Sequence, residues 1–238
     1  MTYDYLSAIV RHKEMISPSM IRIVLKDGDL HRFESTGYGD EFIWLSFPVA
    51  GSTDEKGRYY TVRNWCHESK ELTVDFVKHE TGIATHWARQ VDVGDNIRLL
   101  KPRSRFAPPE KTDYIILIAD ITGLPAVGRV LEELPKGFKA IVHVEVPCEA
   151  DKQEIATQGD VHIVWHCCHG LRDDRKGYTE LPRIAAEIKE LPEGLGYIYI
   201  AGEARAASAC RKHFRDVLGF DKKRIDAVGY WIEGQARV

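Results

Sequence analysis

The pattern of hydrophobic and polar residues differs between the first and the second part of the chain. Over roughly the first 105 residues, short runs rich in β-branched and aromatic residues are separated by clusters of Gly, Asp or Ser. This pattern is typical of the strands of a barrel or sandwich. A segment with helical character, 82–90, interrupts the series. The strands that we predict here are 20–27, 42–48, 58–65, 71–78 and 96–102.

The rest of the chain alternates apolar runs with amphipathic segments. The run "YIILIAD" suits a strand buried on both faces, and "GLPAVGRVLEELP" has the spacing of an amphipathic helix. Such alternation implies a parallel sheet with right-handed crossovers. The predicted strands are 114–120, 139–146, 160–167, 196–202 and 224–231, and the predicted helices are 123–135, 150–157, 179–191 and 203–219.

The pattern changes at "RFAPPEKTD", residues 105–113, where Pro108 and Pro109 prevent regular structure. We interpret this segment as a linker. The sequence therefore predicts two domains, an antiparallel β-barrel at 1–107 and a parallel-sheet α/β domain at 113–238.

Composition narrows the classes of partner. The 33 Lys and Arg against 36 Asp and Glu give a net charge of −3, which provides no general attraction to nucleic acid or anionic membranes. An anionic ligand must therefore meet a local basic patch. The sequence shows no charged leader with an apolar core and no run of about 18 apolar residues. With five cysteines and no disulfide-framework spacing, we expect a soluble, cytoplasmic monomer with free thiols.

The segment "RYYTVRNW" mixes chemistry on both faces of a predicted strand. Alternation places Arg58, Tyr60 and Val62 on one face and Tyr59, Thr61 and Arg63 on the other. A flavin needs a flat aromatic neighbour, a hydroxyl near its ring nitrogens and cations for its pyrophosphate. An ordinary barrel strand fits the same pattern, so both interpretations stay open at this point.

The segment "HETGIATHWA" passes from a predicted strand into a predicted helix. Gly82 and the small Ala84 lie at this turn, between His79 and the hydroxyl of Thr85. Free backbone N–H groups and the helix dipole at such a turn favour an anion such as a pyrophosphate. The alternative is a plain strand-to-helix turn with Trp87 in the core.

Two further turns follow predicted parallel strands, whose carboxyl ends are where such sheets bind ligands. The first, "IADITGLP", contains Asp120, Thr122 and Gly123, and the second, "IAGEARA", contains Gly202 and Glu203. Either could be an ordinary turn of a doubly wound sheet. Gly202 would allow close approach of a ligand to the backbone.

Basic residues cluster in one segment, and a short run of His and Cys offers possible metal ligands. Arg98, Lys101, Arg103 and Arg105 fall within eight residues and form either a solvated face or an anion-binding patch. The run "HCCH", 166–169, does not suit zinc, because neighbouring strand residues point to opposite faces and structural zinc ligands are usually spaced further apart. We therefore predict no metal site.

Taken in order, four motifs resemble the siderophore-interacting protein family of FAD-dependent ferric-siderophore reductases. They are Arg58-x-Tyr60-Thr61-Val62-Arg63, "DFVKHETGIATHWA", "IADITGLPAVGRVLEELP" and the closing "AGEARAASACRKHFRDVLGFDKKRIDAVGYWIEG". The resemblance covers nearly the whole chain. It implies a ferredoxin reductase-like fold, with an N-terminal antiparallel β-barrel that binds FAD and a C-terminal parallel-sheet α/β domain that binds NADPH or NADH.

The resemblance also assigns roles to residues. Tyr60 would stack on the isoalloxazine and Thr61 would face the ring, which makes these two the expected catalytic pair. The remaining cofactor-binding residues that it implies are Arg58, Val62, Arg63, His79, Gly82, Ala84, Thr85, Asp120, Thr122, Gly123, Gly202, Glu203, Tyr230 and Trp231.

Two positions depart from the family's pattern. A Gly-Pro-x-Gly turn is common where this chain has "KPRSRF", 101–106. Cys168 stands near the strand end where the family often has an arginine that could engage the 2′-phosphate of NADPH. The choice between NADPH and NADH is therefore left open.

The implied reaction passes a hydride from the nicotinamide to FAD and then single electrons to Fe(III) held by a siderophore. Ferric catecholate complexes are anionic, and the candidate cations for binding them are Lys101, Arg105, Arg129 and Arg237. Two alternatives remain: a flavin reductase with another electron acceptor, and a siderophore-binding module without reductase activity.

Overall fold

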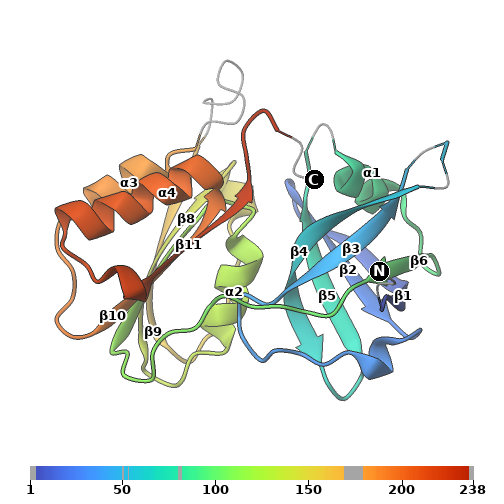
Figure 1. Ribbon diagram of the computed structural model, residues 1–238, viewed down its shortest axis with the longest axis horizontal. Helices are drawn as coiled ribbons and strands as arrows, with labels where there is room; N and C mark the ends of the chain where they lie inside the picture. Colours follow the sequence, from blue (N-terminus) through green and yellow to red (C-terminus); the bar gives the residue numbers. More distant parts are fainter. Residues whose placement is uncertain (1–3, 50, 53, 80–81, 169–178, 236–238) are drawn as a thin grey trace. The chain divides into compact units, whose positions relative to one another are not determined.

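The computed structural model in Figure 1 describes residues 4–49, 51–52, 54–79, 82–168 and 179–235. The chain divides between Arg105 and Phe106 into two compact units, each with its own hydrophobic core. The first unit is built from β-strands and the second from strands and helices. The domain ranges 1–107 and 113–238 stay a prediction.

The first unit is a closed barrel of antiparallel strands in the order β1-β2-β5-β4-β3-β6. The barrel closes because β6 pairs with both β1 and β3. One α-helix, α1 at Ile83–Gln90, and a short 3-10 helix at Leu30–Arg32 accompany the strands. The strands are β1 (Leu6–Ser17), β2 (Met20–Lys26), β3 (Phe42–Pro48), β4 (Glu55–Cys66), β5 (Glu71–Val77) and β6 (Asn96–Leu99).

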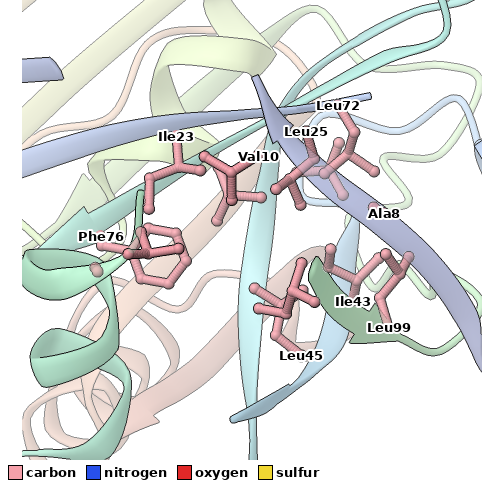
Figure 2. Close-up of a cluster of buried hydrophobic side chains, with 14 of the residues drawn as sticks. Ala8, Val10, Ile23, Leu25, Ile43, Leu45, Leu72, Phe76 and Leu99 are labelled. Carbon is pink, nitrogen blue, oxygen red and sulfur yellow. The ribbon is translucent and has the colours of Figure 1, made fainter. Parts of the chain in front are cut away.

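Alternate side chains of these strands fill the barrel (Figure 2). Because the side chains of a strand point to opposite faces in turn, every second residue enters the interior. In β3 these are Ile43, Leu45 and Phe47, all fully buried. The labelled residues from the other strands, among them Val10, Ile23 and Leu72, complete a hydrophobic core.

The second unit is a parallel five-stranded sheet in the order β11-β10-β7-β8-β9. Its strands are β7 (Tyr114–Ala119), β8 (Lys139–Val146), β9 (Asp160–Cys167), β10 (Gly196–Glu203) and β11 (Ile225–Trp231). From β7 the chain adds strands on one side, and after β9 it returns to place β10 on the other. The strand order thus reverses between β7 and β10, which is where open α/β sheets bind ligands.

Helices cover both faces of this sheet. Figure 1 shows α3 and α4 on one face and α2 on the other. The α-helices are α2 (Leu124–Glu132), α3 (Leu181–Glu187) and α4 (Ala204–Lys212), and α4 continues as a π-helical turn, His213–Val217. Two 3-10 turns, Glu149–Asp151 and Lys222–Arg224, complete the helical segments.

The predicted fold class, a β-barrel followed by a parallel α/β sheet, is confirmed. The sequence interpretation missed β1, whose second half is mostly polar and partly exposed. The predicted helix at 150–157 is wrong, because only Glu149–Asp151 is helical there. Burial alternates from residue to residue over 152–157, so the segment has no continuous face for a helix to bury.

None of the helices in the described ranges has the length and hydropathy needed to span a bilayer.

Candidate functional site

The inner face of β4 carries Tyr60 into a cluster of aromatic rings. The Tyr60 ring centroid lies 4.4 Å from that of Phe76 and 6.1 Å from that of Phe47. Trp87 of α1 packs against both phenylalanines, at 5.6 and 5.4 Å. Burial raises the pKa of the Tyr60 phenol, so the hydroxyl stays protonated and can donate a hydrogen bond.

The outer face of β4 carries Tyr59, which is 56% exposed. Its ring meets those of Phe42 and Trp44 from β3 edge-on, at 5.4 and 4.8 Å. Gly57 makes room for this arrangement, since a Cβ there would lie 1.8 Å from the Trp44 ring. Sequence reasoning missed this exposed aromatic group, although the alternation of "FIWLSFP" places Phe42 and Trp44 on one face.

A β-bulge interrupts the alternation of β4 at Arg63. The register with β5 shifts between Val62 and Asn64, and Thr61, Val62 and Arg63 are all buried. The extra residue lets consecutive side chains enter buried surroundings.

Arg63 shares a buried carboxylate with a second arginine. Its Nε lies 3.9 Å from Oδ2 of Asp75. Asp75 also accepts two hydrogen bonds from Arg22, at 2.8 and 2.7 Å. Arg58 is half-buried, and its guanidinium donates to the carbonyl of Gly57 at 2.7 Å. The two arginines of the strand motif therefore occupy different surroundings.

The side chain of Thr85 forms hydrogen bonds that stabilise the turn into α1. Thr85 Oγ1 donates to the carbonyl of Val77 at 3.0 Å and accepts from the N–H of His79 at 3.4 Å. Ala84 and Thr85 are buried, so their side chains face the barrel, whereas His79 and Gly82 are exposed.

The amino end of α1 fits an anionic group. Gly82 has a φ of 129°, a backbone conformation that favours glycine, and space for a Cβ is open. As N-cap it has no side chain to satisfy the first N–H groups of the helix. Gly82 and Thr85 also line a groove of about 680 Å³ that extends along α1 past Trp87 to Asn96. N–H groups without a side-chain cap beside a groove of this size suit the pyrophosphate of a dinucleotide such as FAD.

In the α/β unit, the predicted residues at the carboxyl edge come together around Asp120. Its buried carboxylate accepts hydrogen bonds from the N–H of Thr122 at 2.8 Å, the Thr122 hydroxyl, the N–H of Glu203 at 2.9 Å and Nε1 of Trp231 at 2.8 Å. Burial raises the pKa of Asp120, and the four donors oppose that shift.

Glycines allow the close packing of this edge. A Cβ on Gly202 would lie 2.5 Å from Asp120 Oδ2, and one on Gly123 would lie 2.8 Å from the Ala201 Cβ. Glu203 is the N-cap of α4, and its carboxylate accepts from the N–H of Ala206 at 2.7 Å. Both glycines are buried, and they let neighbouring segments pack closer at this edge than a Cβ would permit.

Tyr230 and Trp231 are half-buried neighbours held by different partners. The Tyr230 hydroxyl lies 3.1 Å from the Tyr199 hydroxyl on β10. Trp231 instead reaches Asp120, at the end of β7. The structure therefore brings Asp120, Thr122, Glu203 and Trp231 into one hydrogen-bonded group.

The ends of β8 and β9 carry acidic groups and thiols. Cys168 is buried and donates to Glu145 at 3.3 Å, and Glu145 also accepts from the hydroxyl of Thr179 and, at 3.0 Å, from the N–H of Glu180. Burial raises the pKa of Glu145. Cys168, where the family often has arginine, is thus part of a closed internal network.

The candidate basic residues lie in unlike surroundings. Lys101 and Arg105 are exposed. The segment between them is extended, because Arg103 pairs with Phe42, and Asp40 accepts from Ser104 and from the N–H of Arg105. Arg129 is buried on α2 and pairs with Glu133 at 2.8 Å. Arg237 lies outside the described residues.

Across the described ranges, no three His, Cys, Asp or Glu residues are grouped as metal ligands. His166 of the "HCCH" run instead lies 3.0 Å from His143, with the two rings stacked. His169 falls outside the described ranges.

Comparison with known proteins finds two family models that match this chain. The family described as siderophore-interacting protein matches residues 112–234, and the siderophore-interacting FAD-binding domain matches residues 54–106. The chain is 29% identical to the ferric vibriobactin reductase ViuB of Vibrio cholerae, over 98% of this chain and 91% of that protein. It is 28% identical to the NADPH-dependent ferric-chelate reductase of Escherichia coli, over 92% and 89% of the two chains.

Solved structures agree with this assignment. A siderophore utilization protein from T. fusca superposes with a TM-score of 0.86 at 27% identity, covering 100% of this chain and 97% of that one. The match to the siderophore-interacting protein family, residues 112–234, covers more than half of the sequence by itself. The chain therefore belongs to the siderophore-interacting protein family.

Proposed function

We propose that this protein is an FAD-dependent ferric-siderophore reductase that draws electrons from NADPH or NADH. The observation that carries the proposal is that each unit offers one half of a dinucleotide-dependent reductase. The barrel offers an uncapped helix end beside a groove of about 680 Å³, and the α/β unit offers a hydrogen-bonded ligand edge where the strand order reverses. The names of the ferric reductases that it resembles support the same reaction.

In the barrel, we assign FAD to the strand motif of β4 and to the turn before α1. Tyr60 and Thr61 would contact the ring system, with Val62 beside them and Arg58 and Arg63 as the nearby cations. His79, Gly82, Ala84 and Thr85 would form the phosphate end. Since Ala84 and Thr85 are buried, we expect backbone N–H groups rather than these side chains to meet the phosphates.

When bound, FAD supplies the conversion between the two electrons of a hydride and the single electron that ferric iron accepts. The chain's own residues bind and orient the groups that react. The protonated Tyr60 hydroxyl and the buried Thr61 hydroxyl can hold hydrogen bonds that survive in a site from which water is excluded.

In the α/β unit, we assign the nicotinamide nucleotide to the carboxyl edge formed by β7, β10 and β11. Thr122 and Gly123 directly precede α2 there, Gly202 and Glu203 directly precede α4, and Tyr230 and Trp231 end β11. Asp120 ties these segments together.

The ferric siderophore is the substrate, and the protein needs no iron ligand of its own. Reduction favours release, because hard oxygen ligands hold Fe(II) more weakly than Fe(III). Lys101 and Arg105 are exposed and can attract an anionic ferric complex even in a chain of net charge −3. Arg129 and Arg237 stay predictions, and the Arg129 guanidinium is buried against Glu133.

We also propose that the protein acts in the cytoplasm as a monomer. The five cysteines are all free thiols in the structure, which supports a reducing compartment. Size-exclusion chromatography with light scattering tests the monomer, and fractionation of cells tests the compartment.

The decisive experiment measures iron reduction directly. The anaerobically reduced protein is mixed with a ferric catecholate siderophore and, separately, with ferric citrate, while a ferrous chelator traps Fe(II). We expect Fe(II) from the siderophore complex. Reduction of citrate-bound iron alone would indicate a reductase with another acceptor, and siderophore binding without Fe(II) would indicate a binding module.

A matched pair of charge variants tests the substrate patch. Lys101→Gln with Arg105→Gln should raise the siderophore concentration needed for half-maximal reduction, whereas Lys56→Gln, an exposed change elsewhere on the barrel, should leave it unchanged.

Flavin reduction by NADPH and NADH, followed side by side by stopped flow, decides between the two donors.

A further inference from the structure

Trp231 is aimed by an irregularity at the end of β11. The register between β10 and β11 shifts after Gly202 and Gly229, so that Glu203 pairs with Trp231 rather than with Tyr230. Such bulges re-aim a side chain next to a site. Here the shift directs the indole Nε1 to Oδ2 of Asp120, at 2.8 Å.

Asp120 has no capacity left for a further partner. A carboxylate offers about four acceptor positions. Oδ1 accepts from the N–H and hydroxyl of Thr122, and Oδ2 accepts from the N–H of Glu203 and from Trp231. The residue is only 5% exposed, and the Gly202 backbone lies against its carboxylate.

The group thus joins the ends of three neighbouring strands, two of which, β7 and β10, flank the reversal of strand order. Asp120 follows β7, Glu203 ends β10 and Trp231 ends β11. Glu203 in turn caps α4 and accepts from the N–H of Glu233 at 3.4 Å, beyond Trp231. Movement of the indole would break a hydrogen bond to a buried carboxylate, which is costly.

We propose that Asp120 is a positioning residue that holds the Trp231 indole as a fixed wall of the nicotinamide-nucleotide site, acting on the nucleotide through Trp231 and not by contact. This rests on the proposed function for the identity of the ligand. Trp231 is then a static part of the site rather than a mobile cover.

Tryptophan fluorescence of the full chain without cofactor tests the fixed wall. The emission of Trp231 is the difference between the parent and Trp231→Phe. In Asp120→Asn, whose amide cannot accept at all four positions, acrylamide quenching of this difference signal should rise about twofold or more. Asp113→Asn is the matched control, because Asp113 lies at the opposite end of β7 and accepts a hydrogen bond from the Leu195 N–H. Unchanged quenching in Asp120→Asn would overturn the proposal.

Flavin reduction by NADPH or NADH tests the coupling. Asp120→Asn and Trp231→Phe should each raise the half-saturating nucleotide concentration, by about tenfold for one lost hydrogen bond to a charged group. The variant that combines both substitutions should have the same half-saturating concentration as Trp231→Phe alone. If the two fold-increases multiply in the combined variant, Asp120 acts independently of Trp231 and the proposal fails.

The proposal can still be tested if one variant does not fold or if the proposed reductase function is wrong. If Asp120→Asn does not fold, Trp231→Phe carries the test, because it keeps an aromatic ring of smaller size and removes the N–H donor. An unchanged half-saturating concentration would then overturn the proposal. If neither nucleotide reduces the flavin in the parent protein, the proposed function fails, while the quenching result still decides whether Asp120 fixes Trp231.

Discussion

Two adjacent tyrosines of β4 have opposite surroundings. Tyr60 belongs to the aromatic cluster between β4, β5 and α1, whereas Tyr59 lies on the outer face with Phe42 and Trp44. Both could stack on a flat ring, so composition alone does not decide between them. Their places on the strand make the choice testable by single substitutions.

Tyr60→Ala should lower the affinity for FAD, by about twofold to tenfold, because an aromatic stack contributes roughly 0.5 to 1.5 kcal/mol beyond burial. Tyr60→Phe keeps the ring and controls for lost barrel packing, and should retain most of the affinity. Tyr59→Ala should change it by less than about twofold. Fluorescence titration of the FAD-free protein measures all three. A larger loss in Tyr59→Ala than in Tyr60→Ala would move the flavin to the outer face.

At the scale of elements, α1 depends on one hydroxyl for its position. Thr85→Val should destabilise the barrel by about 1 kcal/mol, because the Val77 carbonyl loses its donor from Thr85. Amide hydrogen exchange should quicken at the start of α1. Thr85→Ser retains the hydroxyl and should stay close to the parent protein in urea unfolding. Equal stability of the Val and Ser variants would show that this tie contributes little.

The β8–β9 pair should make the protein acid-sensitive. Burial, with His166 and His162 nearby, lowers the pKa of His143 to about 4, and burial lowers that of His166 as well. As the pH falls, the imidazole of His143 therefore becomes protonated near pH 6.5 in the unfolded chain but only near pH 4 in the folded protein. Stability should fall between these values and show no further loss from His143 below them.

His143→Gln should flatten this part of the stability curve, by no more than about 1 to 2 kcal/mol because the ring is only partly buried. Urea unfolding at a series of pH values from 7 to 4 measures the difference. His67→Gln, a change of an exposed histidine, is the control and should follow the parent curve. Parallel curves for His143→Gln and the parent would contradict the prediction.

Periodicity predicted the elements that bury a continuous face, and failed where burial is uneven. The strands of the parallel sheet were found because β7 and β10 are buried along their whole length. β1 was missed because its apolar alternation ends after Val10. The site was predicted as separate strand motifs and turns, but the bond from Trp231 to Asp120 joins residues 111 positions apart and depends on a bulge that no local pattern reveals.

At the scale of the whole molecule, the chemistry is divided between two units with separate cores. The net charge of −3 gives no general attraction to anions, so binding of a dinucleotide must come from local groups in each unit. Each unit should therefore respond to its own ligand.

FAD should raise the unfolding temperature of the apo-protein, because a ligand that binds only the native state stabilises it by about 2.7 kcal/mol at 100 times its Kd. For a unit of this size, that corresponds to a shift on the order of 10 °C. Riboflavin has the same ring but lacks the pyrophosphate and adenosine, so it cannot use the N–H groups at the start of α1 and should give a much smaller shift. Differential scanning calorimetry with each ligand measures the effect. Equal shifts for riboflavin and FAD would show that the end of α1 takes no part in binding, and no shift with either would contradict a flavin site in the barrel.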